Sequence, residues 1–526
     1  MGISKTLLGK AAVPAVLLLL SLYIVKRVAL YFKLRHFGGP WWTGVSHWPH
    51  SRAIISPNCH EWYAEMNEKH GMHNPMLVAW DNGDRIPFGP ITRIAPGILI
   101  TSSPELWAHV NRHPGYKRSD WYYHACRIEY QRDNVFTQTD NEKHEKRRKQ
   151  MAPGYSGREN LDLEPTIDHR LEELLDLIRS KYLSSDSKVV PMDLAKKIQY
   201  FTLDVISAVG LGKAFGMLRT DSDVDDYLKS TEEGLSTVRF ACAAGISWIA
   251  QSPIIGKFIA PSPTDNNGFG KMISACFRYV EERTKKSTDE RSDMLSSFIR
   301  HGLSGDELKS EALEQIIAGS DTTAAAIRGT LLQIITNPRV YAKLQREIDE
   351  AVRDGKAPAY GDGIITLGQV KRLSYLQAVI RESLRVWPPV LNIFSRDVPA
   401  GGDTVEVNGE THFLPGGVCV GYSGYAMHRS EATYGIDSAA FRPERWFEPD
   451  SAKLASMTQT NDLVFGHGNF MCLGRPVAQM ELLKTIFEVL RNFELALNDP
   501  VRPWRAKNCM GLFVISDMWV QVTERI

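Results

Sequence analysis

One ten-residue segment constrains this chain more than any other. Positions 465–474 read F-G-H-G-N-F-M-C-L-G, and a helical pattern follows from Arg475 to Arg491. The glycines let the backbone turn tightly and approach a flat ligand closely. Cys472 stands just before the helix, where the positive end of the helix dipole favours its thiolate form. The segment therefore predicts a cysteine that a glycine-rich turn holds against a planar group.

Three roles are open to a cysteine in this setting. It can be a buried structural residue, which is the commonest fate of a cysteine. It can be the nucleophile of a hydrolase. Its thiolate can also bind haem iron and push electron density onto it, which favours cleavage of an O–O bond. The third role is favoured because Phe465, Gly468, Cys472 and Gly474 stand at the spacing of a haem-thiolate segment.

A second segment places polar residues inside an apolar helical pattern. Positions 318–323 read A-G-S-D-T-T within a pattern that runs over 308–336. A buried acid is costly unless it has a function. The Thr322 hydroxyl can compete for hydrogen bonds of the helix, and Gly319 leaves room beside it, so we expect a groove next to Asp321 and Thr322. Taken alone, the segment is also compatible with an ordinary bend in a core helix.

Two further segments complete the pattern. E-S-L-R at 382–385 puts its two charges on one helical face, and F-R-P-E-R-W follows at 441–446. With these four segments the chain resembles the cytochrome P450 family, and the resemblance extends over the whole chain. It implies the cytochrome P450 fold, with haem b as the cofactor and Cys472 as the axial ligand of the haem iron.

The resemblance also assigns roles to individual residues. Asp321 and Thr322 would relay protons to dioxygen. The turn around the haem would be formed by Phe465, Gly468 and Gly474. A buried charged triad that locks the core beside the haem would be formed by Glu382, Arg385 and Arg445.

Haem propionates need cations. The resemblance assigns this role to His144 and Arg148 of the H-E-K-R-R segment and to Arg396. Two positions before the cysteine many members carry a basic residue that reaches a propionate, but this chain has Phe470, so one expected contact is missing. A solvated basic face that suits an acidic electron donor is expected from Lys146, Arg147 and Lys149.

The N-terminal segment is strongly apolar. Positions 11–25 carry no charge, and Lys26 and Arg27 follow. Long basic side chains can reach water from inside the apolar layer, so a transmembrane helix over about 8–32 is feasible. A cleaved signal peptide is the alternative, but no small-residue cleavage site closes the apolar run. We therefore expect a single-pass anchor at 1–36 in the endoplasmic reticulum membrane, with the domain at 37–526 in the cytosol.

Helical periodicity dominates the rest of the chain, so the expected fold class is mainly α with a small β part. The predicted helices cover 161–182, 189–211, 269–283, 308–336, 339–352, 367–386 and 475–491. The predicted strands are a hairpin at 91–101 and runs at 404–407, 418–421 and 513–522. A net charge of +1 gives no electrostatic reason to expect a nucleic-acid partner. Seven cysteines without a C-x-x-C pair argue against a zinc site and against a secreted disulfide scaffold.

One stretch departs from the resemblance. Family members usually pass from a short helix to the first strand through K-x-G-P-I-x-R-I, whereas here 72–89 separate K-H-G at 69–71 from P-I at 90–91. Deleting 72–89 restores K-H-G-P-I-T-R-I. We interpret the stretch as an unspliced intron in the translated sequence. A surface loop is the alternative, because loops tolerate insertions well.

Within the family, the chain resembles the filamentous-fungal, pisatin-demethylase-like monooxygenases of secondary metabolism, which include mycotoxin pathways. The matching segments are Y-K-R-S-D-W-Y-Y at 116–123, D-N-V-F at 133–136, M-A-P-G-Y-S-G at 151–157 and D-M-W-V at 517–520.

The resemblance implies a monooxygenase that hydroxylates, epoxidises or otherwise oxidises a lipophilic small molecule. Its electrons would come from NADPH through a separate NADPH-cytochrome P450 reductase, with cytochrome b5 as a second donor. We expect the substrate site to be lined by 121–136, by 238–255 and by the helix before Ala318. A haem-thiolate isomerase or dehydratase and a non-catalytic haem-binding module are the alternatives. Asp321 and Thr322 argue against both.

Overall fold

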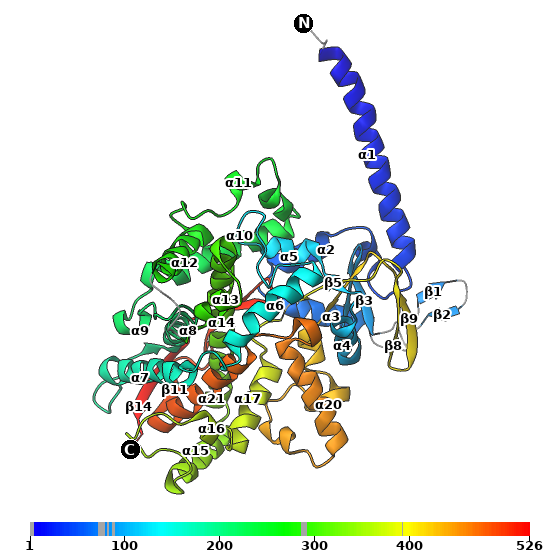
Figure 1. The fold of residues 1–526 in the computed structure, drawn as a ribbon. Helices are drawn as coiled ribbons and strands as arrows, with labels where there is room; N and C mark the ends of the chain where they lie inside the picture. The colour runs from blue at the N-terminus through cyan, green and yellow to red at the C-terminus, as the bar shows by residue number, and fades with distance from the viewer. Residues whose placement is uncertain are drawn as a thin grey trace.

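The computed structural model describes residues 5–71, 79–81, 84–86, 90–285, 292–391 and 393–525; side chains at 5–13, 15, 16, 19, 79–81 and 84–86 lie outside this description. The fold is mainly helical with a small β part, as the sequence predicts (Figure 1). The longer helices are α1 Lys5–Leu34, α2 Trp48–Ile55, α3 Cys59–His70, α4 Pro104–Arg112, α6 Asn141–Tyr155, α7 Leu163–Lys181, α8 Leu194–Leu211, α10 Tyr227–Ala243, α12 Gly268–Thr284, α14 Gly305–Ile335, α15 Pro338–Arg353, α17 Ser374–Val386, α20 Ser451–Asp462 and α21 Arg475–Asn492.

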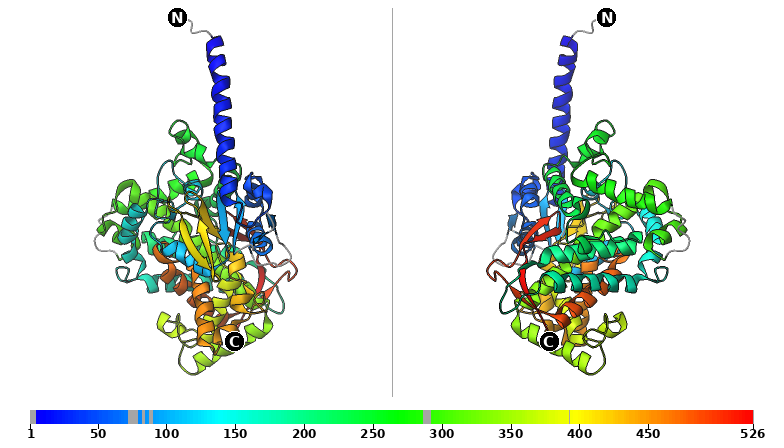
Figure 2. Two further views of the ribbon diagram at one scale, coloured as in Figure 1. Left: turned by 90° about the vertical axis from the view of Figure 1, so that its right-hand side faces the viewer. Right: turned by 90° about the vertical axis from the view of Figure 1, so that its left-hand side faces the viewer.

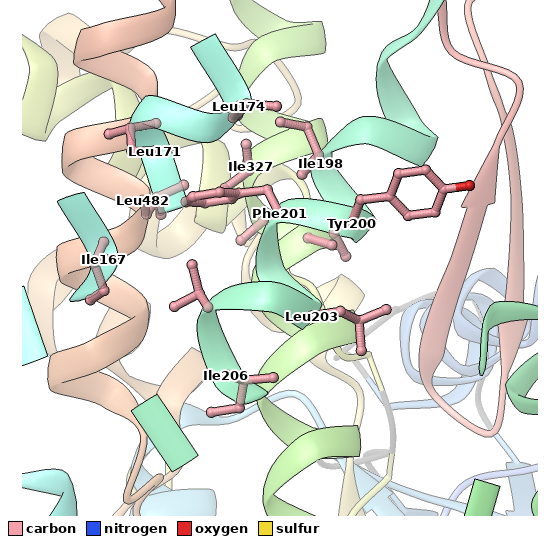
Figure 3. Packing of buried hydrophobic residues seen from close by; sticks show 14 of the residues in the cluster. Ile167, Leu171, Leu174, Ile198, Tyr200, Phe201, Leu203, Ile206, Ile327 and Leu482 are labelled. Carbon is pink, nitrogen blue, oxygen red and sulfur yellow. The ribbon is translucent and has the colours of Figure 1, made fainter. Parts of the chain in front are cut away.

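The centre of the molecule is built around α14, the longest of these helices at 31 residues. It packs along α8 and against α17 and α21. Apolar side chains recur around almost the whole circumference of α8, so this helix is buried on nearly all sides. Figure 3 shows its Phe201 in one core cluster with Leu171 of α7, Ile327 of α14 and Leu482 of α21. This core fixes the position of α14, which carries the A-G-S-D-T-T segment.

The β part is divided: β3, β5, β8 and β9 lie on one side of the molecule, and β11 and β14 lie on the other (Figure 1). Its largest sheet has the order β3-β4-β10-β7-β5, in which β10 runs parallel to β4 and the other neighbours are antiparallel. These strands are β3 Ile91–Ala95, β4 Ile98–Thr101, β5 Lys117–Arg118, β7 Arg396–Asp397 and β10 Cys419–Tyr422. The smaller sheets are formed by β8 Asp403–Val407 with β9 Glu410–Leu414, β12 Arg505–Cys509 with β13 Leu512–Ser516, and β11 Phe493–Leu497 with β14 Trp519–Glu524 and β6 Met192–Asp193.

Two predicted elements are divided in the structure. The helix predicted over 367–386 is a short α16, Leu367–Val370, followed by α17. The strand predicted over 513–522 is β13 and β14, which lie in different sheets. The division falls at Asp517, whose φ of 57° is left-handed, so the chain leaves one sheet there and enters another.

The predicted membrane span coincides with α1, a 30-residue helix that extends away from the rest of the molecule (Figure 2). Part of the span, at 8–13, 15, 16 and 19, lies outside the residues whose side chains the structure describes. Among the described residues, none of the helices is long and apolar enough to cross a membrane. The structure therefore does not support the predicted transmembrane helix.

The predicted insertion at 72–89 lies outside the described side chains. Its described backbone forms an antiparallel pair, β1 Ala79–Asp81 with β2 Asp84–Ile86. The two flanks of the insertion are close together, since a Cβ on Gly71 would stand 2.6 Å from Thr92 Oγ1. The intron interpretation stays a prediction.

Candidate active site

The glycine-rich segment forms a tight turn that presents Cys472 just before α21. Gly466 and Gly468 have φ values of 73° and 57°. A Cβ on Gly468 would stand only 2.6 Å from the Asn111 carbonyl oxygen, so both backbone conformation and space require glycine there. The Cys472 N–H donates to the Phe465 carbonyl at 2.7 Å and closes the turn.

The Cys472 thiol faces a space inside the protein. Burial raises its pKa, while the backbone N–H of Gly474, the Arg148 guanidinium and the backbone N–H of Arg475 act in the opposite direction. Cys472 is nevertheless solvent-accessible, so a ligand can reach it. The helix dipole alone does not make this thiol acidic. A metal ion would, because a coordinating thiol loses its proton.

Two predicted propionate ligands come from α6. His144 is buried, and Arg148 lies near enough to Cys472 to affect its pKa. With Phe470 and Leu473 they line a cavity of about 330 Å³. Burial lowers the pKa of His144 to about 2, with further contributions from Arg118, Arg148 and Arg396, so this imidazole is neutral at physiological pH.

Phe470, which replaces the expected basic residue, is surrounded by the other candidate cations. The Arg396 guanidinium lies 4.1 Å and the Arg118 guanidinium 5.1 Å from the centroid of its ring. The His144 ring lies 5.2 Å away. Cation–π attraction holds the two arginines in place. Arg118 was missed in the sequence, because it reaches this cluster only through the pairing of β5 with β7, which sets it opposite Arg396.

These residues fit the two carboxylates of a haem. His144 Nε2, Arg118 Nε and Arg396 Nε are buried and have no hydrogen-bond partner among the described residues. Nor does a carboxylate in the described part of the chain form an ion pair with Arg118, Arg148 or Arg396. Buried positive charges of this kind are costly unless an anion joins them.

Asp321 lies on the side of α14 that faces α8. Its Oδ1 accepts a hydrogen bond from Gln199 Nε2 at 2.9 Å, and its Oδ2 is buried without a partner in the described structure. Burial raises the pKa of Asp321 to about 6, although Arg328 and Gln199 lower it. Arg328 also donates to Gln199 Oε1 at 2.8 Å. Neither Gln199 nor Arg328 was singled out in the sequence, since their proximity depends on how α8 packs on α14.

Thr322 lies on another side of α14. Its hydroxyl donates to the Ala318 carbonyl at 2.8 Å, so it competes for a helix hydrogen bond as predicted. Ala318 itself is exposed. By contrast, a Cβ on Gly319 would stand 2.7 Å from Ile206 of α8. Asp321 and Thr322 are therefore neighbours in the chain that face different surroundings.

The structure brings Glu382, Arg385 and Arg445 together in the core, with Glu382 and Arg385 fully buried and Arg445 2% exposed. Glu382 Oε1 lies 2.7 Å from Arg385 Nη2 and 2.8 Å from Arg445 Nε. Glu382 Oε2 accepts from Arg385 Nε at 2.9 Å and from Trp446 Nε1 at 3.0 Å. Both charged residues of the E-x-x-R segment, Glu382 and Arg385, are therefore ion-paired and hydrogen-bonded in the core.

One expectation for α6 is wrong. Arg147 does not belong to a solvated basic face, because its Nη1 lies 2.5 Å from Oε1 of the fully buried Glu311. Lys146 and Lys149 are exposed as expected. The helical pattern alone could not separate Arg147 from its basic neighbours, since its partner is supplied by α14.

An accessible thiol in a glycine turn, with nearby arginines that have no carboxylate partner among the described residues, is what a thiolate-ligated haem requires, so the site fits a haem-thiolate protein. The model of the family described as Cytochrome P450 matches residues 87–518. The cytochrome P450 monooxygenase ABA1 of Pyricularia oryzae is 39% identical over 451 residues, which cover 84% of this chain and 86% of that protein. The cytochrome P450 monooxygenase aba1 of Botryotinia fuckeliana is 38% identical over 443 residues, covering 83% and 85%. For abl1 of Leptosphaeria maculans the identity is 31% over 499 residues, covering 92% and 82%.

The chain belongs to the cytochrome P450 family. It is a haem monooxygenase, its haem is thiolate-ligated, and its electrons come from NADPH through a reductase. The cytochrome P450 fold expected from the sequence is confirmed.

Proposed function

We propose that this protein is a fungal monooxygenase of secondary metabolism that inserts oxygen from dioxygen into a lipophilic small molecule. NADPH-cytochrome P450 reductase is its proposed electron donor, with cytochrome b5 as a second donor. The observation that carries the proposal is the placement of Asp321 and Thr322 on the central helix α14, with Thr322 one turn after the exposed Ala318. The relatives named above come from fungi and are monooxygenases by name.

The chain's own residues supply binding and proton handling. Cys472 would hold the iron, and Arg118, His144, Arg148 and Arg396 would hold the propionates. When bound, the haem supplies the activation of dioxygen by electrons. Thr322 Oγ1, which donates to a carbonyl of its own helix, can turn to donate a proton elsewhere. Asp321, with a pKa of about 6, exchanges protons readily near neutral pH, as a general acid or base must.

The proposed site for attachment to the endoplasmic reticulum membrane is the end of the molecule at which α1 projects. The short helix α11, Gly256–Ile259, lies toward the same end in all three ribbon views (Figures 1 and 2). Ile254 and Phe258 there are 79% and 77% exposed. Large apolar side chains that are exposed close together are typical of a surface that contacts a membrane or another protein. The same segment adjoins the expected substrate-lining region at 238–255.

The monooxygenase proposal is tested by tracing dioxygen. The purified protein, NADPH-cytochrome P450 reductase and NADPH are incubated under oxygen-18 dioxygen with a panel of lipophilic small molecules. We expect substrate-dependent consumption of NADPH and a product that carries one labelled oxygen atom or has lost hydrogen. A product formed without NADPH would identify an isomerase or dehydratase instead. Haem binding without any product across the panel would favour the non-catalytic module.

A further inference from the structure

Two carboxyl groups precede the A-G-S-D-T-T segment on α14, Glu311 fully buried and Glu314 partly accessible, and they have different hydrogen-bond partners. Glu311 is fully buried and accepts from Arg147 Nη1 at 2.5 Å and from the Val135 backbone N–H at 3.0 Å. It therefore ties α14 to α6 and to the loop before α6. Among the described residues, Glu314 accepts only from Asn134 Nδ2, at 3.0 Å through Oε2. In the part of the chain that the structure describes, its Oε1 has no partner.

The position of Glu314 on the helix directs it toward the proposed reaction site. Residues four apart lie above one another on a helix, so Glu314, Ala318 and Thr322 form one stripe. Ala318 is exposed and Glu314 is partly accessible. Glu314 lies at one edge of this stripe, two turns before Asp321, and its bond to Asn134 places it on the side of α14 that faces the loop before α6. Asn134, the partner of Glu314, lies within the predicted substrate-lining segment 121–136.

The surroundings of Glu314 keep its carboxyl group neutral at pH 7. Burial first, and then the neighbouring Glu311, raise its pKa to about 8, although Arg118 and the hydrogen bond from Asn134 lower it. The other titratable groups near enough to interact with it are Cys126 and Tyr155, and burial raises the pKa of both, so neither is charged at pH 7. A neutral carboxyl can both donate and accept, and one of its oxygens is already oriented by an amide.

We infer that Glu314, oriented by Asn134, is a specificity residue that hydrogen-bonds a hydroxyl or carbonyl oxygen of the lipophilic substrate. This inference deepens the proposed function and rests on it. It assigns an already oxygenated, uncharged molecule as the substrate class. In an apolar pocket, a site built to bond such an oxygen discriminates strongly against the analogue that lacks it.

The test uses ligands whose imidazole binds the haem iron, so that each of them binds near α14 whatever the natural substrate is. The helix rises about 6 Å from Ala318 to Glu314 and about 12 Å from Thr322 to Glu314, a span that an alkyl chain can cover. The probes are 1-hexylimidazole, its terminal alcohol and its terminal amine. Their dissociation constants are measured from the shift of the Soret band in the wild type, Glu314→Leu, Glu314→Gln and the control Glu350→Gln, which alters an exposed acid on α15.

We expect Glu314→Leu to weaken binding of the alcohol by about tenfold or more and binding of the hexyl compound by less than about threefold, because a buried hydroxyl is then left without a partner. Glu314→Gln, which still donates and accepts, should keep most of the affinity for the alcohol, and Glu350→Gln should match the wild type. Equal effects of Glu314→Leu on both probes would overturn the inference. The assigned class would be wrong if the wild type bound the amine about tenfold more tightly than the alcohol. A wild type without a Soret shift for any probe would instead overturn the proposed function.

Discussion

Replacing Glu382 by glutamine should destabilise the protein by about 3–5 kcal/mol, since a buried ion pair that loses one partner leaves uncompensated charge. Here the charge left behind is double, because both Arg385 and Arg445 lie on the same carboxylate. Most of the variant should fail to bind haem at 37 °C. The measurement is the free energy of unfolding from urea titration, followed by helical circular dichroism.

Glu65→Gln is the matched control for that experiment. Glu65 also pairs with a cation one helical turn away, Lys69 at 3.4 Å, but the two side chains are 58% and 65% exposed. A surface pair of this kind contributes little, so the control should unfold at the wild-type urea concentration. If Glu382→Gln also unfolded at the wild-type urea concentration, the buried triad would not stabilise the fold.

Replacing Asp321 by asparagine should have opposite effects on activity and stability. As a proposed proton-transfer group, Asp321 should contribute about 10²-fold or more to turnover. Its folded pKa of about 6 lies above the value of an unfolded aspartate. The folded state therefore binds this proton more tightly, and the protein loses stability as the pH rises through about 4 to 6. The variant, which can still accept from Gln199, should be more stable than the wild type at pH 7 by on the order of 2–3 kcal/mol.

This prediction is checked by product formation and by urea unfolding at pH 4 and pH 7. The difference in stability should be present in full at pH 7 and small at pH 4, where the wild-type carboxyl is protonated in the folded state and about half protonated in the unfolded state. Asp354→Asn, which alters an exposed acid outside the core, should leave turnover unchanged. If Asp321→Asn kept full turnover, Asp321 would have no role in proton transfer.

Features that depend on short stretches of sequence could be predicted. The turn around Cys472 needs glycines at fixed positions, so its residues can be read in order. The helix that carries Asp321 and Thr322 is predicted within three residues at its start and one at its end, because its apolar pattern is long and Asn337-Pro338 ends it.

Contacts between distant elements could not be predicted in the same way. Arg118 reaches the Phe470 ring because β5 pairs with β7, and Gln199 reaches Asp321 because α8 packs on α14. Arg147 is indistinguishable from its lysine neighbours until Glu311 is placed opposite it. The break at Asp517 between two strands also escapes an analysis of hydrophobic pattern, because a single left-handed residue causes it.

We propose that Cys472 itself binds the haem iron as a thiolate. The absorption spectrum of the reduced protein with carbon monoxide reports which ligand the iron has. The wild type should show the red-shifted Soret band of a thiolate ligand, and Cys472→Ala should lose that band. Cys276→Ala, which removes another buried free cysteine, should retain it. A Cys472→Ala protein that keeps the band, or a haem-loaded wild type that lacks it, would show that the Cys472 thiolate is not the iron ligand.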